Sequence, residues 1–499
     1  MRRVPLLSGS RVVLVPVADD DVVLRPPPPP DQVVDVRAAV RDAFRFPLSG
    51  SPLAAVARRG GRATIAVEPP ALPVPGVQHD PRCEALAATI GELAACGIPD
   101  SRQTILVATG LGRRAGVRDL ARWLLPPALA RSFRGELVVH DAESPDLVPV
   151  VDSSSPVRIN RTVVESDITV VVGAAETVLH GGPGTLLAAT DAQTIRRVAA
   201  ADSLLEAAGG PEWQLALAVE SVVGKRTPLL GVSLVLDLPR LTGTFRGYPD
   251  ELETVVSLAR SPLRALVSSL PEPVRRAILG RQGRRLVATA AYAGPPSVAH
   301  AEALLRGVAL RRTRLDGPLD ALVVGVPWTG LEFPRQPVNP ITVAAIALGT
   351  ALRLRRDAFP IRPGGTLVLV HPLRRTFAPT TQAPYAAMFR ALRDAHDDET
   401  LTAAEADAVS DGRAVDAYRS GAACHPALPY ADWASCQPAL AQLGRVIVAG
   451  CRDAAAARTL GFVPSQGVSS ALEMAHGVAG GRGRLGILLA PPYPALVVG

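Results

Sequence analysis

Histidine, arginine and glycine gather in three short segments of the first half of the chain, each directly after an apolar run. Residues 109–113 (TGLGR) combine backbone amides with a guanidinium, which suits a phosphate or a carboxylate. At 140–141 (HD) an imidazole beside a carboxylate can act as a base, a metal ligand or a hydrogen-bond anchor. Residues 173–185 add a histidine, a proline and four glycines. The candidate catalytic residues are His140 and His180, and the candidate cofactor-binding residues are Thr109, Gly110, Arg113, Gly181, Gly182 and Gly184.

Structural explanations compete with these functional ones. A tight turn between a strand and a helix, with arginines on the surface, accounts for residues 109–113, and a histidine that caps a strand end accounts for His140. Residues 173–185 are harder to explain as a plain connector, because their glycines permit close backbone contact with a ligand. The sequence therefore favours a functional loop most clearly in this third segment.

The apolar runs are short, rich in β-branched residues and separated by helical patterns, which is typical of parallel α/β proteins. Strands are expected at 62–68, 103–108, 136–140, 168–173, 320–326, 366–371, 445–449 and 484–490. Helices are expected at 81–96, 116–133, 341–356, 384–395 and 469–476. Because ligands gather at the carboxyl ends of parallel strands, we expect Gly110, His140, Gly182 and Trp328 to line one cleft.

The order of these elements predicts two α/β domains with mainly parallel sheets that face each other across a cleft. An N-terminal extension with a proline-rich linker covers residues 1–46, the first domain 47–315 and the second 316–499. The linker includes residues 25–31 (RPPPPPD), a composition typical of a stiff, extended segment. Residues 245–315 are rich in Arg, Leu and Pro, and we expect them to be helical.

Composition narrows the class of protein. The 499 residues carry a net charge of +7, and Lys225 is the only lysine among 53 basic residues. With 48% hydrophobic residues the chain is globular, and aromatic side chains, at 4%, are not interleaved with the arginines. We therefore expect no nucleic-acid partner, and we expect the arginine clusters at 311–314 and 353–356 to be solvated surface.

Cysteine usage and hydropathy give further expectations. The five cysteines form no C-x-x-C pair and have no zinc-like spacing, which indicates free thiols in a reducing compartment and no metal site. The longest uncharged run, 336–352, contains prolines and is shorter than the roughly 20 residues that span a membrane. The N-terminus is not a convincing signal peptide. We expect a cytoplasmic protein without membrane contact, and its oligomeric state stays open.

Taken in order, these segments resemble the lactate racemase family. The resemblance lies in RATIAVEPPALPVP, AACGIPDSRQTILVATG, GELVVHDAES and RINRTVVESDITVVVG, and in VIVAGCRDAAAARTLGFVPSQGVSSALEMA near the end of the chain. It implies a two-domain fold and an isomerase: a racemase or epimerase of 2-hydroxy acids that uses a nickel-pincer nucleotide.

The positions that carry the family's chemistry match poorly. The family's D-x-T-R-P falls on residues 68–73 (EPPALP), and Gly112 stands where A-T-G-x-H-R has a catalytic histidine. The family's second histidine falls two positions before His180, and its pincer-bearing lysine falls on a leucine pair, 186–187. A covalent pincer therefore has only Lys225 to bind, and we expect that lysine to lie away from the glycine-rich loop.

Two functions of different classes stay open. One is a nickel-pincer-dependent racemase with a degraded active site, in which histidine moves the hydroxyl proton. The other is a non-racemase member that binds an anionic small molecule or a nucleotide in the cleft through glycines and arginines. Loss of the acid–base and metal positions favours the second, with a small anionic ligand as the partner.

Overall fold

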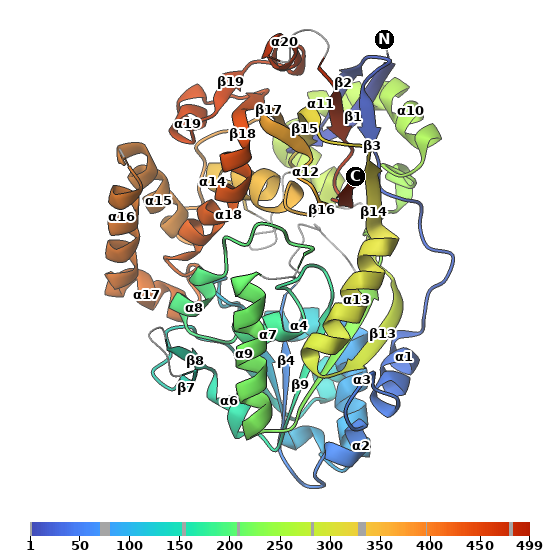
Figure 1. Ribbon diagram of the computed structural model, residues 1–499, viewed down its shortest axis with the longest axis vertical. Helices are drawn as coiled ribbons and strands as arrows, with labels where there is room; N and C mark the ends of the chain where they lie inside the picture. Colours follow the sequence, from blue (N-terminus) through green and yellow to red (C-terminus); the bar gives the residue numbers. More distant parts are fainter. Residues whose placement is uncertain are drawn as a thin grey trace.

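The computed structural model describes residues 2–69, 80–151, 156–206, 210–280, 284–327, 336–395, 397–478 and 483–499. Two lobes lie one above the other along the long axis of the molecule, each built on a six-stranded sheet (Figure 1). The strands of both sheets pair mainly in parallel, and helices pack on both faces. The expected fold class is therefore confirmed.

The first lobe has the strand order β13-β10-β9-β4-β5-β6, in which β13 pairs antiparallel with β10 and the other neighbours are parallel. Side chains alternate along the central strands, so Ile65 and Val67 face one helical layer and Ala66 faces the other. The strands are β4(Ala63–Val67), β5(Gln103–Val107), β6(Glu136–Val139), β9(Ile168–Ala174), β10(Leu229–Leu236) and β13(Ala288–Gly294).

Helices cover both faces of this first sheet. One layer holds α1(Val36–Arg45), α3(Pro81–Ala95) and α4(Val117–Leu124). The opposite layer holds α6(Arg161–Glu165), α7(Pro183–Leu187) and α9(Pro211–Arg226). The lobe also contains α2(Leu53–Val56), η1(Asp100–Arg102), α5(Pro127–Ser132), β7(Val148–Val151), β8(Val157–Ile159), α8(Ala192–Arg197) and α13(Pro296–Arg311).

The second lobe has the strand order β19-β18-β17-β15-β20-β3, with every neighbouring pair parallel. Its strands are β3(Val22–Leu24), β15(Leu319–Gly325), β17(Ile361–Val370), β18(Leu443–Ala449), β19(Val463–Ser465) and β20(Leu485–Leu488). The face toward the first lobe packs against α14(Pro340–Ala344), the π-helical turn η3(Ala345–Ala351), α15(Ala383–Asp394), α18(Leu428–Gln442) and α19(Ala454–Thr459). The other face packs against α10(Leu252–Arg260), α20(Val468–Val478) and the hairpin β1(Arg2–Ser8)–β2(Arg11–Val17).

Several smaller elements complete the second lobe. A three-stranded parallel sheet has the order β14-β21-β16. The remaining elements are β11(Arg240–Leu241), η2(Gly243–Phe245), α11(Pro262–Ser269), α12(Glu272–Gly280), β12(Arg284–Arg285), β14(Arg312–Leu315), β16(Arg355–Asp357), α16(Asp398–Ser410), α17(Gly412–Arg419) and β21(Ala495–Val498). Among the residues described, no helix is both long and apolar enough to cross a membrane.

Two segments from the first half of the chain pack on the second lobe. The hairpin β1–β2 and helix α10 share an apolar cluster with β15, and the Tyr248 hydroxyl donates to the carbonyl of Pro5 at 2.9 Å. From β3 the proline-rich linker runs down the side of the molecule to α1 (Figure 1). Thr313 and Arg240 donate to the linker carbonyls of Arg25 and Pro27 at 2.7 and 2.8 Å. The two lobes are thus discontinuous in sequence.

The structure differs from the expected elements in two places. The helix expected at 341–356 widens into the π-helical turn η3 and ends before Arg355, where the chain enters β16. The stretch 245–315, expected to be helical, contains β13 between its helices. The sequence of β13 (ATAAYAG) is mostly small residues, so local preference gave no strand signal there, and pairing with β10 decides its conformation.

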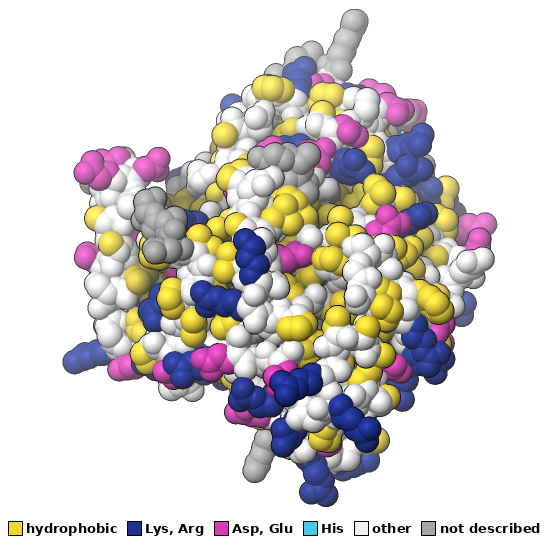
Figure 2. Space-filling model, turned by 60° about the horizontal axis from the view of Figure 1, so that its bottom comes forward, with side chains coloured by type: hydrophobic (Ala, Val, Ile, Leu, Met, Phe, Trp, Pro, Cys, Tyr) yellow, Lys and Arg dark blue, Asp and Glu magenta, His cyan; other side chains and the backbone are white. Residues whose placement is uncertain are grey.

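The expectation of solvated arginine clusters is wrong at three positions. Arg311, Arg353 and Arg355 are only 4, 3 and 7% exposed. Arg311 donates to the carbonyl of Ala175 at 2.9 Å, and Arg355 pairs with the Asp202 carboxylate at 2.7 Å. Elsewhere the expectation fits the surface better: Figure 2 shows basic side chains on one face interspersed with acidic and apolar ones.

Candidate functional site: a cavity between the lobes

A cavity of about 350 Å³ lies between the two lobes. The first lobe lines it with residues that follow the carboxyl ends of β4, β5 and β9, and the second lobe with residues of α14, η3, α15 and α18. This is the edge at which parallel sheets usually hold ligands. The polar side chains of the lining are Glu68, Thr109, Thr177, His180, Thr342, Thr350, Arg353, Gln382, Tyr385, Asp432 and Ser435.

Glu68 directly follows β4 and is a buried carboxyl group of the first-lobe wall. The neighbouring cation is Arg82 of α3, which bonds to Asp80 at 2.5 Å and to Glu176 at 3.0 Å. Burial and the Glu176 carboxylate raise the pKa of Glu68 to about 8. Glu68 therefore carries its proton at neutral pH.

His180 opens into the cavity from the loop before α7. Its Nδ1 lies 2.7 Å from the Thr177 hydroxyl, and the side chain is exposed and lines the cavity. Desolvation by the surrounding cavity walls lowers the pKa of His180 from its ordinary value. The Glu176 carboxylate opposes this shift, and the Arg353 guanidinium adds to it. The imidazole is therefore neutral at pH 7 and available to a ligand in the cavity.

Arg353 is the buried cation of the second-lobe wall. Its Nη1 donates to the carbonyls of Gly349 and Ser435, each at 3.2 Å, and more weakly to that of Ala199 at 3.4 Å. Its Nε has no hydrogen-bond partner, and within the described part of the chain its guanidinium forms no ion pair. Burial lowers the pKa of Arg353 to about 10, so it stays charged at pH 7. A buried, unpaired cation is costly, which points to an anion as its partner.

The π-helical turn η3 positions Arg353. Asn339 caps α14 by accepting from the backbone amides of Ile341 and Thr342, and the helix then widens at Ala345. Such widened turns occur frequently at functional sites. Gly349 lets this turn approach α18, because a Cβ there would lie 2.1 Å from the Ser435 hydroxyl oxygen. The close approach brings the guanidinium to the cavity wall.

The remaining polar groups of the cavity come from both lobes. Tyr385 donates to the Asp432 carboxylate at 2.6 Å, and burial raises the pKa of Asp432 to about 6. The hydroxyl oxygens of Thr109 and Thr342 are buried and have no hydrogen-bond partner. Unmet polar groups on facing walls cost free energy that a polar ligand in contact with both lobes would recover.

Side chains of α17 and of the loop after it hold the lobes together beside the cavity. The Tyr418 hydroxyl accepts from the amide of Ala142 at 3.0 Å and donates to the carbonyl of Gly110 at 3.3 Å. His425 Nε2 lies 3.0 Å from Glu143 Oε1. The second lobe therefore fixes the loops after β5 and β6 in place.

The structure places His140 outside this cavity, so the expectation that it lines the cleft is wrong. The ring is fully buried, its Nε2 donates to the carbonyl of Thr190 at 2.7 Å, and its Nδ1 accepts from Asn160 at 3.3 Å. Burial lowers its pKa to about 4. Both ring nitrogens are satisfied within the first lobe, which supports the structural explanation of this histidine.

The proposed cofactor-binding residues divide into two groups. Thr109, Gly110 and Gly184 line the cavity, whereas Gly181, Gly182 and Arg113 do not. Gly182 has φ of +52°, and a Cβ there would lie 2.3 Å from the Cβ of His300. The glycines of this loop thus leave room for the His300 side chain to pack against the backbone. Arg113 is exposed and donates to the carbonyl of Gly421 at 2.7 Å.

Sequence reasoning missed most of the second-lobe wall. Trp328, expected in the cleft, lies outside the described residues. Arg353 belongs to an arginine cluster that the sequence predicted to be solvated. Tyr385 and Asp432 lie in no glycine-rich or histidine-containing motif. The sequence signal that could have indicated these residues is their position on helices that follow β15 and β17, because such helices begin at the carboxyl edge of the sheet.

The lysine-linked group that the family resemblance implies does not fit these residues. Lys225 is exposed in the last turn of α9, next to the amino end of β10, where Leu229 pairs with Thr169. The glycine-rich loop follows the other end of β9, about 20 Å away along the strand. Lys225 therefore lies away from that loop, as expected. Within the described ranges, no group of three or more His, Cys, Asp or Glu residues is arranged to hold a metal ion.

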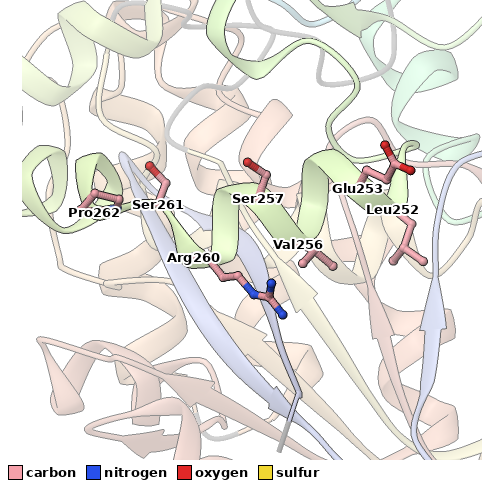
Figure 3. A pocket seen from close by; sticks show the side chains of 7 residues that line it. All are labelled: Leu252, Glu253, Val256, Ser257, Arg260, Ser261 and Pro262. Carbon is pink, nitrogen blue, oxygen red and sulfur yellow. The ribbon is translucent and has the colours of Figure 1, made fainter.

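A second hollow of about 740 Å³ follows the outer side of α10, where Figure 3 shows its side chains along one helix and the start of the next. It is an open surface, and none of the polar side chains that line it has a buried atom without a hydrogen-bond partner. We therefore place the candidate site between the lobes. The residues of the hollow are Leu252, Glu253, Val256, Ser257, Arg260, Ser261 and Pro262.

Comparisons with known proteins agree with this architecture. Residues 9–182 match the family model of the lactate racemase N-terminal domain. The lactate racemase apoprotein from Thermoanaerobacterium thermosaccharolyticum aligns over 100% of both chains, with a TM-score of 0.62 and 13% identity. A Thermotoga maritima protein solved as a structural genomics target aligns over 93% of this chain and 97% of its own, with a TM-score of 0.51 and 11% identity. No curated protein matches.

Proposed function

We propose that the interlobe cavity of this chain, whose residues 9–182 match the lactate racemase N-terminal domain, binds a small organic anion held by Arg353. The observation that carries the proposal is the buried, unpaired guanidinium at the cavity wall. Arginine binds carboxylates through charge-assisted hydrogen bonds that are roughly twice as strong as neutral ones. The unmet hydroxyls of Thr109 and Thr342 would orient the bound anion.

The proposal assigns no role to a lysine-linked nickel-pincer nucleotide. Lys225 lies at the wrong edge of the sheet, and the leucines at 186–187 offer no amine for such a link. His180 favours a second candidate function, racemisation of a 2-hydroxy acid, because its imidazole opens into the cavity. That reaction needs two opposed bases, and His140 lies outside the cavity. Binding is therefore the function that the site supports best.

Thermal unfolding with a panel of probes tests the proposal: glycolate, both enantiomers of lactate, succinate and adenosine monophosphate. At least one carboxylate should raise the unfolding temperature of the wild type. The R353M variant should bind it roughly 10- to 150-fold more weakly, because a charge-assisted bond contributes about 1.5–3 kcal/mol. The exposed R306M variant is the matched control, since Arg306 pairs only with Glu302 of its own helix in the part described. Unchanged binding by R353M would contradict the proposal.

Two further measurements separate the candidate functions. T342V removes an unmet hydroxyl with little change of shape, so it should weaken binding even if R353M folds poorly. The intact mass should equal that of the unmodified chain, and lactate should not be racemised. A mass increase at Lys225, with racemisation that K225A abolishes, would restore the pincer-dependent function.

A further inference from the structure

Two carboxyl groups share one arginine at the first-lobe wall. Arg82 pairs with both Asp80 and Glu176, so its single positive charge is already more than balanced. Arg311, behind the wall, donates to the backbone carbonyls of Ala175 and Glu176. Among the described residues, no cation remains to pair with Glu68.

Among the described residues, the groups around Glu68 come from several neighbouring elements. Helix α3 contributes Arg82 and its capping Asp80, and the segment after β9 contributes Glu176 and His180. Helix α7 contributes the Thr185 hydroxyl, and the loop before it contributes the Gly181 amide. Arg353 and Asp432 stand on the opposite wall. The two carboxylates near Glu68 already outnumber its nearest cation, Arg82, so an ionised Glu68 would add a further unbalanced buried charge.

We propose that Glu68 enters the cavity as a neutral carboxylic acid and donates a hydrogen bond to the carboxylate that Arg353 holds. This inference rests on the proposed function. A protonated carboxyl group has an O–H donor, and its bond to a carboxylate is short and strong. An ionised Glu68 would offer only acceptors and would repel the ligand. The site therefore accepts a carboxylate only while Glu68 keeps its proton.

The groups around the ligand leave a pH window in which Glu68 alone titrates. The pKa of Asp432 is about 6, that of His180 is lowered from its ordinary value, and that of Arg353 is about 10. Simple carboxylates are fully ionised above pH 6. With the pKa of Glu68 at about 8, the binding-competent fraction falls roughly tenfold between pH 7 and pH 9.

Isothermal titration calorimetry at pH 7, 8 and 9 tests the inference, with the carboxylate of the panel that binds most tightly at pH 7. The dissociation constant of the wild type should rise roughly tenfold from pH 7 to pH 9. E68Q keeps an N–H donor that does not titrate, so its affinity should stay within about threefold of the pH 7 wild type throughout. E302Q changes a partly exposed carboxylate of α13 that pairs with Arg306; it is the matched control and should follow the wild type.

The outcomes separate this inference from the function on which it rests. A wild-type affinity that stays constant to pH 9, or an E68Q affinity that falls in parallel, would overturn the role of Glu68 and leave anion binding in place. Failure of every carboxylate to bind the wild type at pH 7 would refute the proposed function itself.

Discussion

Two polar clusters at the same carboxyl edge of the first-lobe sheet differ in how their groups are satisfied. Around His140, both ring nitrogens have partners within the lobe, from Thr190 and Asn160, and the ring is fully buried. At the cavity wall, the Thr109 hydroxyl is unmet and Glu68 has no cation of its own among the described residues. The first cluster completes the fold, and the second needs something from outside the chain.

The difference arises from which elements face each histidine. Asn160 caps α6 and Thr190 follows α7, so the neighbours of His140 belong to the same lobe. The cavity wall with His180 faces the helices of the second lobe, which contribute a cation and further unmet groups. A histidine that follows a parallel strand therefore indicates a ligand site only where polar groups around it, including those of the facing lobe, have no hydrogen-bond partner within the protein.

The largest effect predicted from this comparison is the change in the free energy of unfolding with pH, which arises from Glu68 at the cavity wall. The folded protein holds the Glu68 proton up to about pH 8, whereas the unfolded chain releases it near pH 4.5. The unfolded state thus binds fewer protons in this window, and wild-type stability falls as pH rises through it. Relative to E68Q, the free energy of unfolding should drop by about 4 kcal/mol between pH 4.5 and pH 8 and then level off. Urea titrations at pH 5, 6.5, 8 and 9 measure this, and parallel curves would contradict it.

Removal of the satisfied histidine should destabilise the protein without a direct effect on the cavity. H140A leaves a void, an unpaired carbonyl at Thr190 and an unpaired amide at Asn160, so it should cost about 3 kcal/mol. Urea unfolding at pH 7 measures the loss. Carboxylate affinity, measured on the folded fraction, should change less than threefold. A loss below about 1 kcal/mol would show that the cluster is not structural.

H180A provides the matched contrast. This ring opens into the cavity and has one side-chain bond, to Thr177, so its loss should cost less than about 1 kcal/mol. It should weaken carboxylate binding several-fold, since the imidazole borders the bound anion. Equal stability losses for H140A and H180A in the same urea series would erase the distinction between the two clusters.

Arg113 should give the smallest effect. Its exposed side chain donates to the carbonyl of Gly421 across the lobes, outside the cavity. R113A should lower the free energy of unfolding by about 0.5–1 kcal/mol and leave carboxylate affinity unchanged. A large loss of carboxylate affinity in calorimetry would contradict this and would show that Arg113 contacts the ligand, as its glycine-rich segment at 109–113 first indicated.

Sequence patterns predicted the sheets better than the site. Runs such as 103–108 and 168–173 are apolar and β-branched because both faces of their strands are buried, so local composition revealed them. The site depends on contacts between distant segments. Arg353 looked like surface because burial of a guanidinium depends on the carbonyls of Ala199 and Ser435, which no local pattern reveals. The glycines at 181–182 were predicted to allow close contact with a ligand, whereas the structure packs the His300 side chain against them.

A crystal structure of the protein with its tightest-binding carboxylate tests the central claim most directly. We predict electron density for the carboxylate between the lobes, within hydrogen-bond distance of the Arg353 guanidinium and of a Glu68 carboxyl oxygen. Density for the ligand in the hollow along α10, with the interlobe cavity holding only water, would contradict the account.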